Sequence, residues 1–137
     1  MKTLLIAVSI AFALPAAAQS VEPGQWEITS TMTSPALPKP QVVTRTECIS
    51  KEDAEDPTRF SGREQTQGCK VTPVARSAES YSWTVSCPQQ GMNGAGRVLF
   101  GRGTIEGELR MTLEMQGQKI DMLSRTAGRR VGSCAAK

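Results

Sequence analysis

Apolar and polar residues alternate along several stretches of the chain, which is the pattern of β-strands with one buried face. In residues 109–115, leucine or methionine fills every odd position, while arginine, threonine and glutamate fill the even ones. Residues 26–32 and 81–87 alternate in a similar way, with Trp26 and Trp83 on the apolar sides. The period of two therefore predicts strands at all three places.

Further strands are expected at residues 41–49, 69–78, 97–100 and 125–134, which gives about seven strands in total. The predicted fold class is all-β, an antiparallel meander that forms either a strongly curved sheet or a small, lipocalin-like barrel. The proline-rich segment 34–40 and the glycine-rich segment 91–96 are predicted to be connections. One short helical turn is expected near residues 50–56, where Ser50 can cap the helix and Asp53 completes a capping-box-like pattern.

The last predicted hairpin has its turn at residues 116–118, with the sequence Gln-Gly-Gln. A turn centred near Gly117 places Met115 opposite Ile120 on the apolar side. The same register places Glu114 opposite Asp121, and such like-charge pairs destabilise a sheet. A slip of one residue would turn the apolar side chains outward, so burial should hold the register near this one.

The composition limits the chemistry that the protein can perform. The chain has 137 residues, which is the size of one small domain. It contains no histidine, the residue that activates the nucleophile in Ser-His-Asp triads and Cys-His pairs. The formal net charge of +3 is too small to indicate nucleic-acid binding. We therefore expect no enzymatic activity, no cofactor, no metal and no nucleic-acid partner.

Residues 1–18 have the features of a secretory signal peptide. A positive charge at Lys2 precedes an apolar stretch over residues 4–14, and small residues follow up to Ala18. The apolar stretch is shorter than the roughly 20 residues that a membrane-spanning helix needs. The sequence thus predicts cleavage after Ala18 and a single mature β domain over residues 19–137. This domain is expected to be periplasmic or secreted and not to span a membrane.

The four cysteines Cys48, Cys69, Cys87 and Cys134 indicate two disulfides in an exported chain. The favoured pairing is Cys48–Cys69 with Cys87–Cys134, because it would staple a long loop and tie the chain end to the sheet. The rival pairing is Cys69–Cys87 with Cys48–Cys134, since Cys69 and Cys87 face each other if their hairpin turns at Ala78. The cysteines are too widely spaced to indicate a zinc site.

The apolar side of the predicted sheet supplies the candidate ligand-facing or core residues. These are Trp26, Trp83, Leu109, Met111, Leu113, Met115 and Met122. Thioethers can bind cuprous copper. Methionines that share a stripe with leucines are more often adaptable core filler, or the lining of a cavity for varied apolar guests. The acidic run 52–56 lacks the loop spacing of a calcium site and is interpreted as a solvated helical turn.

Residues 23–29, with the sequence PGQWEIT, resemble the PGxWE(I/V)T start of domain-of-unknown-function family three-six-one-seven. The positions of the four cysteines and the ending RRVGSC at residues 129–134 fit the same family. The resemblance covers essentially the whole chain after the signal segment. It implies an exported protein of Gram-negative bacteria with this cysteine framework, and it implies no catalytic residues.

These observations favour a non-enzymatic binding module that holds an apolar, lipid-like small molecule on a concave sheet face. The alternative is a structural or interaction protein of the cell envelope, with a filled core and functional outer strands. The expected partner is therefore an apolar small molecule or an envelope protein. Whether the sheet encloses an empty space distinguishes the two functions.

Overall fold

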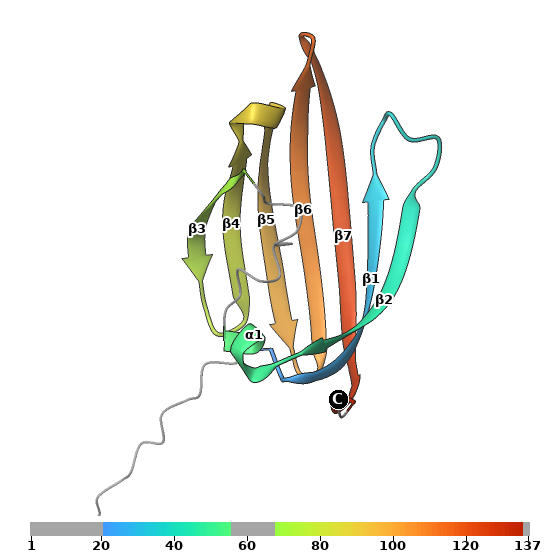
Figure 1. Ribbon diagram of the computed structural model, residues 1–137, viewed down its shortest axis with the longest axis vertical. Helices are drawn as coiled ribbons and strands as arrows, with labels where there is room; N and C mark the ends of the chain where they lie inside the picture. Colours follow the sequence, from blue (N-terminus) through green and yellow to red (C-terminus); the bar gives the residue numbers. More distant parts are fainter. Residues whose placement is uncertain (1–20, 56–67, 136–137) are drawn as a thin grey trace, which may run out of the picture.

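The computed structural model describes residues 21–55 and 68–135, and within them seven strands form one antiparallel sheet (Figure 1). The strands are β1 (Gly24–Thr33), β2 (Gln41–Ile49), β3 (Lys70–Arg76), β4 (Ser80–Cys87), β5 (Met92–Gly101), β6 (Thr104–Met115) and β7 (Gln118–Gly132). Two short helical segments, α1 (Lys51–Glu55) and η3 (Pro88–Gln90), follow β2 and β4. The predicted all-β antiparallel class is confirmed.

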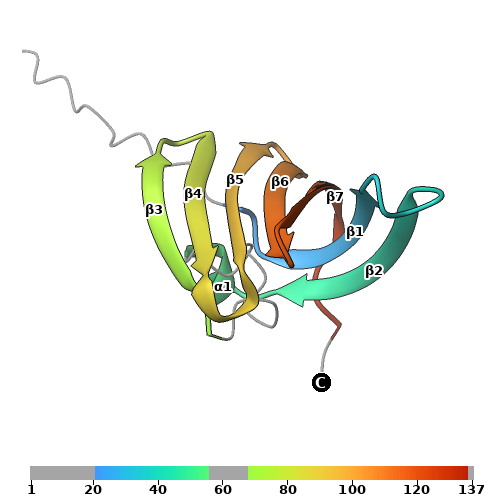
Figure 2. The same cartoon turned by 90° about the horizontal axis from the view of Figure 1, so that it is seen from above.

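The sheet is curled and remains open. Its strand order is β2-β1-β7-β6-β5-β4-β3, so β3 to β7 form a meander while β1 pairs with β7. This arrangement makes β2 and β3 the two edges of the sheet. Figure 2 shows the curl from above, with α1 on its inner side. Of the two predicted forms, the curved sheet is present and the closed barrel is not.

The hydrophobic core lies at the end of the sheet where α1 packs. Its buried residues are Val21, Trp26, Ile28, Ile49, Ala54, Tyr81, Trp83, Val98 and Ile105. The hydroxyl of Ser50 accepts a hydrogen bond from the Asp53 N–H at 3.1 Å and donates one to the Asp53 carboxylate at 2.7 Å. The predicted cap at Ser50 is therefore confirmed, and the helix that it starts brings Ala54 into the core.

The glycine-rich segment 91–96 is not the connection that the sequence predicts, because β5 begins at Met92 and runs through it. Its glycines make room for large side chains on the neighbouring strands. A Cβ atom at Gly94 would lie 2.9 Å from the Cγ of Met111, and one at Gly96 would overlap the indole ring of Trp83. Glycine in a strand can thus mark the close approach of a neighbour as well as a turn.

The β6–β7 hairpin turns on two residues, Gln116 and Gly117. Both have positive φ angles, 51° and 76°, as in the two-residue turns that match the twist of a hairpin. Met115 therefore pairs with Gln118, and the predicted pairing of Met115 with Ile120 is wrong. The difference is two positions, so the apolar side chains stay on the predicted side.

The observed register also removes the like-charge pair that the predicted register contains. Glu114 lies opposite Lys119, whereas Asp121 lies opposite Thr112 and accepts a hydrogen bond from its hydroxyl at 2.8 Å. The predicted repulsion between Glu114 and Asp121 is thus replaced by a pair of opposite charges and by a hydrogen bond. Cross-strand chemistry therefore supports the two-residue turn.

The disulfides are Cys48–Cys134 and Cys69–Cys87, so the favoured pairing from the sequence is wrong and its rival is present. Strands β3 and β4 pair as a hairpin, which sets Cys69 beside Cys87 with 4.2 Å between their Cα atoms. Strand β1 holds β2 on one side and β7 on the other, which brings Cys48 and Cys134 to a Cα separation of 5.4 Å. Strand pairing, and not loop stapling, decides the connectivity.

Two predictions from the sequence concern residues outside the described ranges, namely the signal segment 1–18 and Asp56 in the acidic run. The helical turn expected near residues 50–56 is present as α1, which ends at Glu55. Within residues 21–55 and 68–135, no helix has the length and apolar character required to cross a membrane.

Candidate ligand-binding face

The sheet has an apolar face and a polar face. Directly opposed residues of antiparallel strands point to the same side, so the register assigns each side chain to a face. The apolar face carries Trp26 and Ile28 and lies inside the curl, where α1 packs (Figure 2). The polar face carries charged pairs such as Glu27 and Arg129, whose carboxylate and guanidinium are 2.9 Å apart.

Beyond the core, the apolar face continues as a row of half-buried side chains, here called the apolar stripe. Its members are Met92, Leu109, Met111, Leu113, Ile120 and Met122. Met111 lies opposite Met122, and Leu113 lies opposite Ile120, across β6 and β7. None of the six belongs to the buried core, so each keeps part of its surface accessible.

The structure divides the predicted ligand-facing residues into three groups. Trp26 and Trp83 are core residues with 1% and 5% of their surfaces exposed, so a surface ligand does not reach them. Leu109, Met111, Leu113 and Met122 belong to the apolar stripe. Met115 is 53% exposed at the end of β6, where the sheet stops. The sequence thus identified most of the stripe together with residues that lie outside it.

Three half-buried hydroxyl side chains, Ser30, Ser124 and Thr126, lie on the apolar face between the core and the apolar stripe. The oxygens of Ser30 and Thr126 are 3.2 Å apart, within hydrogen-bond distance. Gly107 lies opposite Thr126 and leaves space there, because a Cβ atom would meet nothing closer than 3.7 Å. The sequence reasoning missed this hydroxyl group. The sequence did contain a sign of this group, because the three residues stand at positions where the alternating pattern places side chains on the apolar face.

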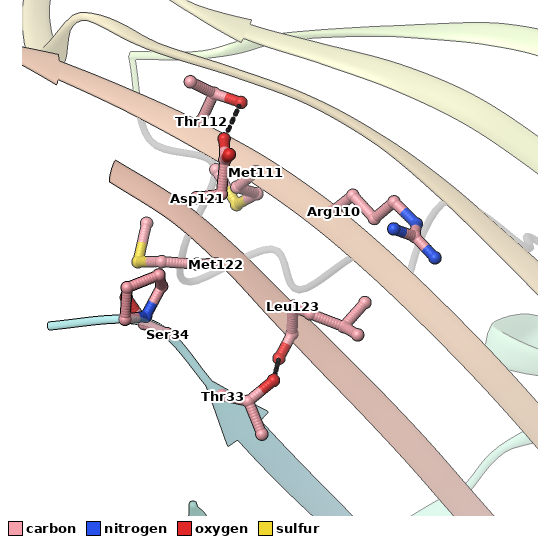
Figure 3. Close-up of a pocket in the computed structure, with 9 residues that line it drawn as sticks. Thr33, Ser34, Arg110, Met111, Thr112, Asp121, Met122 and Leu123 are labelled. Atoms are coloured by element: carbon pink, nitrogen blue, oxygen red, sulfur yellow. Dashed lines mark hydrogen bonds between the residues drawn. The ribbon is translucent and has the colours of Figure 1, made fainter. Parts of the chain in front are cut away.

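A hollow of about 550 Å³ lies where β1 ends, and it is lined by Met111 and Met122 of the apolar stripe together with Arg110, Thr112, Asp121 and Leu123 of the polar face (Figure 3). Strand β1 stops at Thr33, whereas β7 continues past it without a described neighbour on that side. The hydrogen bond between Thr112 and Asp121 borders the same hollow (Figure 3). The hollow is open to solvent, and its volume is that of sites for small molecules.

The polar face has a second open hollow, of about 680 Å³, among charged side chains. There the carboxylate of Glu108 accepts hydrogen bonds from the Nε of Arg110 at 2.8 Å and from the Nε of Arg125 at 3.3 Å. The hydrogen bond from Arg110, followed by that from Arg125, lowers the pKa of Glu108, although partial desolvation opposes them. Glu108 is therefore ionised at neutral pH and holds arginines from two strands.

The part of the chain that the structure describes contains neither a cluster of metal-ligating side chains nor a free thiol. No three His, Cys, Asp or Glu side chains come together there as metal ligands. The Asp53 carboxylate of the acidic run serves the α1 cap. All four cysteines are in disulfides, so none offers a free thiol.

The fold and this face define a small protein with a single curled sheet, two disulfides and an accessible apolar inner surface. A family model with the description "Protein of unknown function (DUF3617)" matches residues 21–134, and the chain belongs to this family. The resemblance seen at residues 23–29 and 129–134 is thereby confirmed. No curated protein and no solved structure matches the chain.

Proposed function

We propose that this protein is a non-enzymatic binding module that holds an apolar small molecule against the apolar stripe. The observation that carries the proposal is the stripe itself: six apolar side chains continue the apolar face beyond the core and remain partly exposed. A soluble domain seldom leaves a contiguous apolar patch uncovered without a binding role. The hollow beside Met111 and Met122 lies at the end of the stripe, where residues of both faces meet, and its volume suits a small molecule.

The chemistry of the face favours an amphiphile over a pure hydrocarbon. The methionines are unbranched and polarisable, so they can adapt to the shape of an acyl chain or a similar apolar body. Beside them, Ser30, Ser124 and Thr126 offer hydroxyls that hydrogen-bond to an uncharged polar group. A ligand with an apolar body and a hydroxyl, ester or amide would satisfy both parts of the face.

Export into an oxidising compartment is part of the same proposal. Disulfides persist in the periplasm and outside cells, and they are rare in the cytosol. The two bridges of this protein support a periplasmic or secreted location. The signal-like segment 1–18 supports the same location.

Titration of the purified, oxidised protein with a fluorescent fatty-acid probe tests the binding function. Met111→Gln and Met122→Gln place an amide in the apolar stripe, and each should weaken probe binding about tenfold. Met115→Gln is the matched control, because it makes the same change at an exposed position beyond the stripe. It should leave the affinity unchanged.

Native mass spectrometry of the gently purified protein should also show a co-purifying apolar molecule. The proposal is wrong if the probe never binds, or if Met115→Gln weakens binding as much as Met111→Gln does. Either result would favour the alternative, an interaction protein of the cell envelope that has no small ligand.

A further inference from the structure

The apolar stripe has a defined length along the strands. It begins at Leu109, which lies opposite Ser124, and its last directly opposed pair is Leu113 with Ile120. Leu113 is four positions beyond Leu109 on β6. A strand rises about 3.3 Å per residue, so these two leucines are about 13 Å apart. Strand β6 ends soon afterwards, at Met115.

The hydrophobic core closes the apolar face at the other end. Past Thr126, the next position on this face of β7 is Gly128, which is buried. A Cβ atom at Gly128 would lie 3.5 Å from the side chain of Ile28 and 3.6 Å from that of Trp26. Core side chains therefore already cover the sheet at this point. A ligand on the stripe has to end at the three hydroxyl side chains.

The open part of the face is also narrow. Val85 and Cys87 continue the rows of the stripe onto β4, where they are 6% and 1% exposed. On the opposite side β1 ends at Thr33 while β7 continues, and no described strand lies beside the stripe there (Figure 1). Adjacent strands are about 4.8 Å apart and apolar carbons pack about 4 Å from one another, so β6 and β7 together hold one alkyl chain.

Hydrogen-bonding groups stand at the core end of the stripe. The oxygens of Ser30 and Thr126 are 3.2 Å apart, and Ser124 adds a third hydroxyl beside them. Each hydroxyl has one donor and two acceptor lone pairs, so the bond between Ser30 and Thr126 uses only part of their capacity. At the other end, the side chains of Leu113 and Ile120 contain no polar atom. The face thus has a polar end at the core and an apolar end near the β6–β7 turn.

We infer that the ligand is a single-chain amphiphile whose chain has about ten to twelve carbons. This inference rests on the binding function proposed above. A carbon–carbon bond of about 1.5 Å advances an extended chain by about 1.3 Å, so about ten carbons span the stripe and the side chain of Leu113 covers about two more. The uncharged polar end lies at the three hydroxyl side chains, and the last carbon lies beside Leu113 and Ile120. A lipid with two chains would leave one chain uncovered.

Displacement of the fluorescent fatty-acid probe by monoacylglycerols tests the length of the chain. The hexanoyl, octanoyl, decanoyl, dodecanoyl and tetradecanoyl compounds share one uncharged polar end and differ only in the tail. Complete burial of a methylene group improves affinity about fourfold, and a chain on an open face is buried on one side, so each carbon should contribute about twofold. The gain should stop at dodecanoyl, because further carbons extend past the pair Leu113 and Ile120.

Two matched leucine variants test the orientation of the chain. Leu113→Gln should weaken dodecanoyl binding about tenfold and leave hexanoyl binding unchanged, because a chain of about six carbons is only about 8 Å long. Leu109→Gln makes the same change near the polar end and should weaken both compounds by similar factors. In the wild-type protein, a nitroxide on the last carbon of a dodecanoyl chain should broaden the methyl NMR signals of Ile120 and spare that of Thr126.

Failure of this inference is distinguishable from failure of the binding function. An affinity that keeps rising beyond dodecanoyl overturns the inferred length while the binding function stands. Equal weakening of hexanoyl and dodecanoyl binding by Leu113→Gln overturns the orientation, as does broadening of Thr126 in place of Ile120. If neither the probe nor any monoacylglycerol binds, the binding function is wrong, and this inference is wrong with it.

Discussion

The indole ring of Trp83 lies over Gly96, its direct neighbour across β4 and β5, at a distance that leaves no room for a Cβ atom. Trp83 is buried and stacks on Tyr81, with 5.3 Å between the ring centroids. The glycine therefore determines how the larger of these aromatic rings packs on the sheet. The contact links the core to the first half of β5, which the sequence pattern did not reveal as a strand.

Replacing Gly96 by alanine should destabilise the fold by about 1–3 kcal/mol, because the new methyl group displaces the Trp83 ring from its packing. Urea unfolding followed by tryptophan fluorescence measures the change. Gly107→Ala is the control on the same face, since its Cβ would meet only ordinary contacts at 3.7 Å. Equal destabilisation by both variants would contradict this account of Gly96.

The two disulfides should contribute unequally to stability. Cys48–Cys134 spans 86 positions and Cys69–Cys87 spans 18. On the chain-entropy model, the bridges are worth about 4–5 and about 3 kcal/mol, respectively. Denaturation of the two double-serine variants measures the difference, with the loss of Cys48–Cys134 expected to cost more. Cys134→Ser alone should leave a reactive thiol at Cys48, and a thiol found at Cys87 would refute the connectivity.

Replacing Arg110 by glutamine should raise the pKa of Glu108, because the hydrogen bond from Arg110 is the main cause of its lowering from 4.5. A lowered carboxyl pKa stabilises the fold above the ordinary pKa, and this contribution is lost as the pH falls through the lowered pKa. In the variant, this contribution should therefore be smaller, and its loss should be complete at a higher pH.

Carboxyl-carbon NMR titration of Glu108 measures this shift. Arg129→Gln is the control, because Arg129 pairs with Glu27 on the same face. It should leave the midpoint of the Glu108 titration unchanged. An unchanged midpoint in Arg110→Gln would show that the hydrogen bond does not persist in solution.

Replacing Gln116 in the β6–β7 turn by asparagine should stabilise the fold. Its φ of 51° lies in the left-handed region, which costs about 1–2 kcal/mol for most residues and less for asparagine. Gln116→Asn creates the Asn-Gly pair that two-residue hairpin turns prefer, and it should stabilise the fold by up to about 1 kcal/mol. Thermal unfolding measures the gain, and a lower melting temperature would argue against the two-residue turn.

Local pattern predicted the strands well, because burial of one face imposes a period of two on any strand. The stretch 41–49 coincides with β2, and 81–87 lies within β4. The helical turn was also predictable, since Ser50 and Asp53 satisfy each other within one turn. Most of the apolar stripe followed from the same alternation in residues 109–115.

Features that depend on pairs between distant strands were not predictable in this way. Gly94 and Gly96 resemble a turn in sequence, and their role becomes clear only from Met111 and Trp83 on neighbouring strands. The disulfide connectivity follows from the position of β1 between β2 and β7, which no local pattern encodes. Met115 follows the alternation but lies where the sheet ends, so its side chain is exposed.

The pairing of β1 with β7 also has a consequence for the time course of folding. Strand β1 cannot pair with β7, its second neighbour in the sheet, until β7 has been synthesised. Without β7, no strand pairing connects the β1–β2 hairpin to the β3–β6 meander. Contacts between the two ends of a polypeptide form slowly. The complete sheet should therefore form late, only after its C-terminal strand is available to pair with β1.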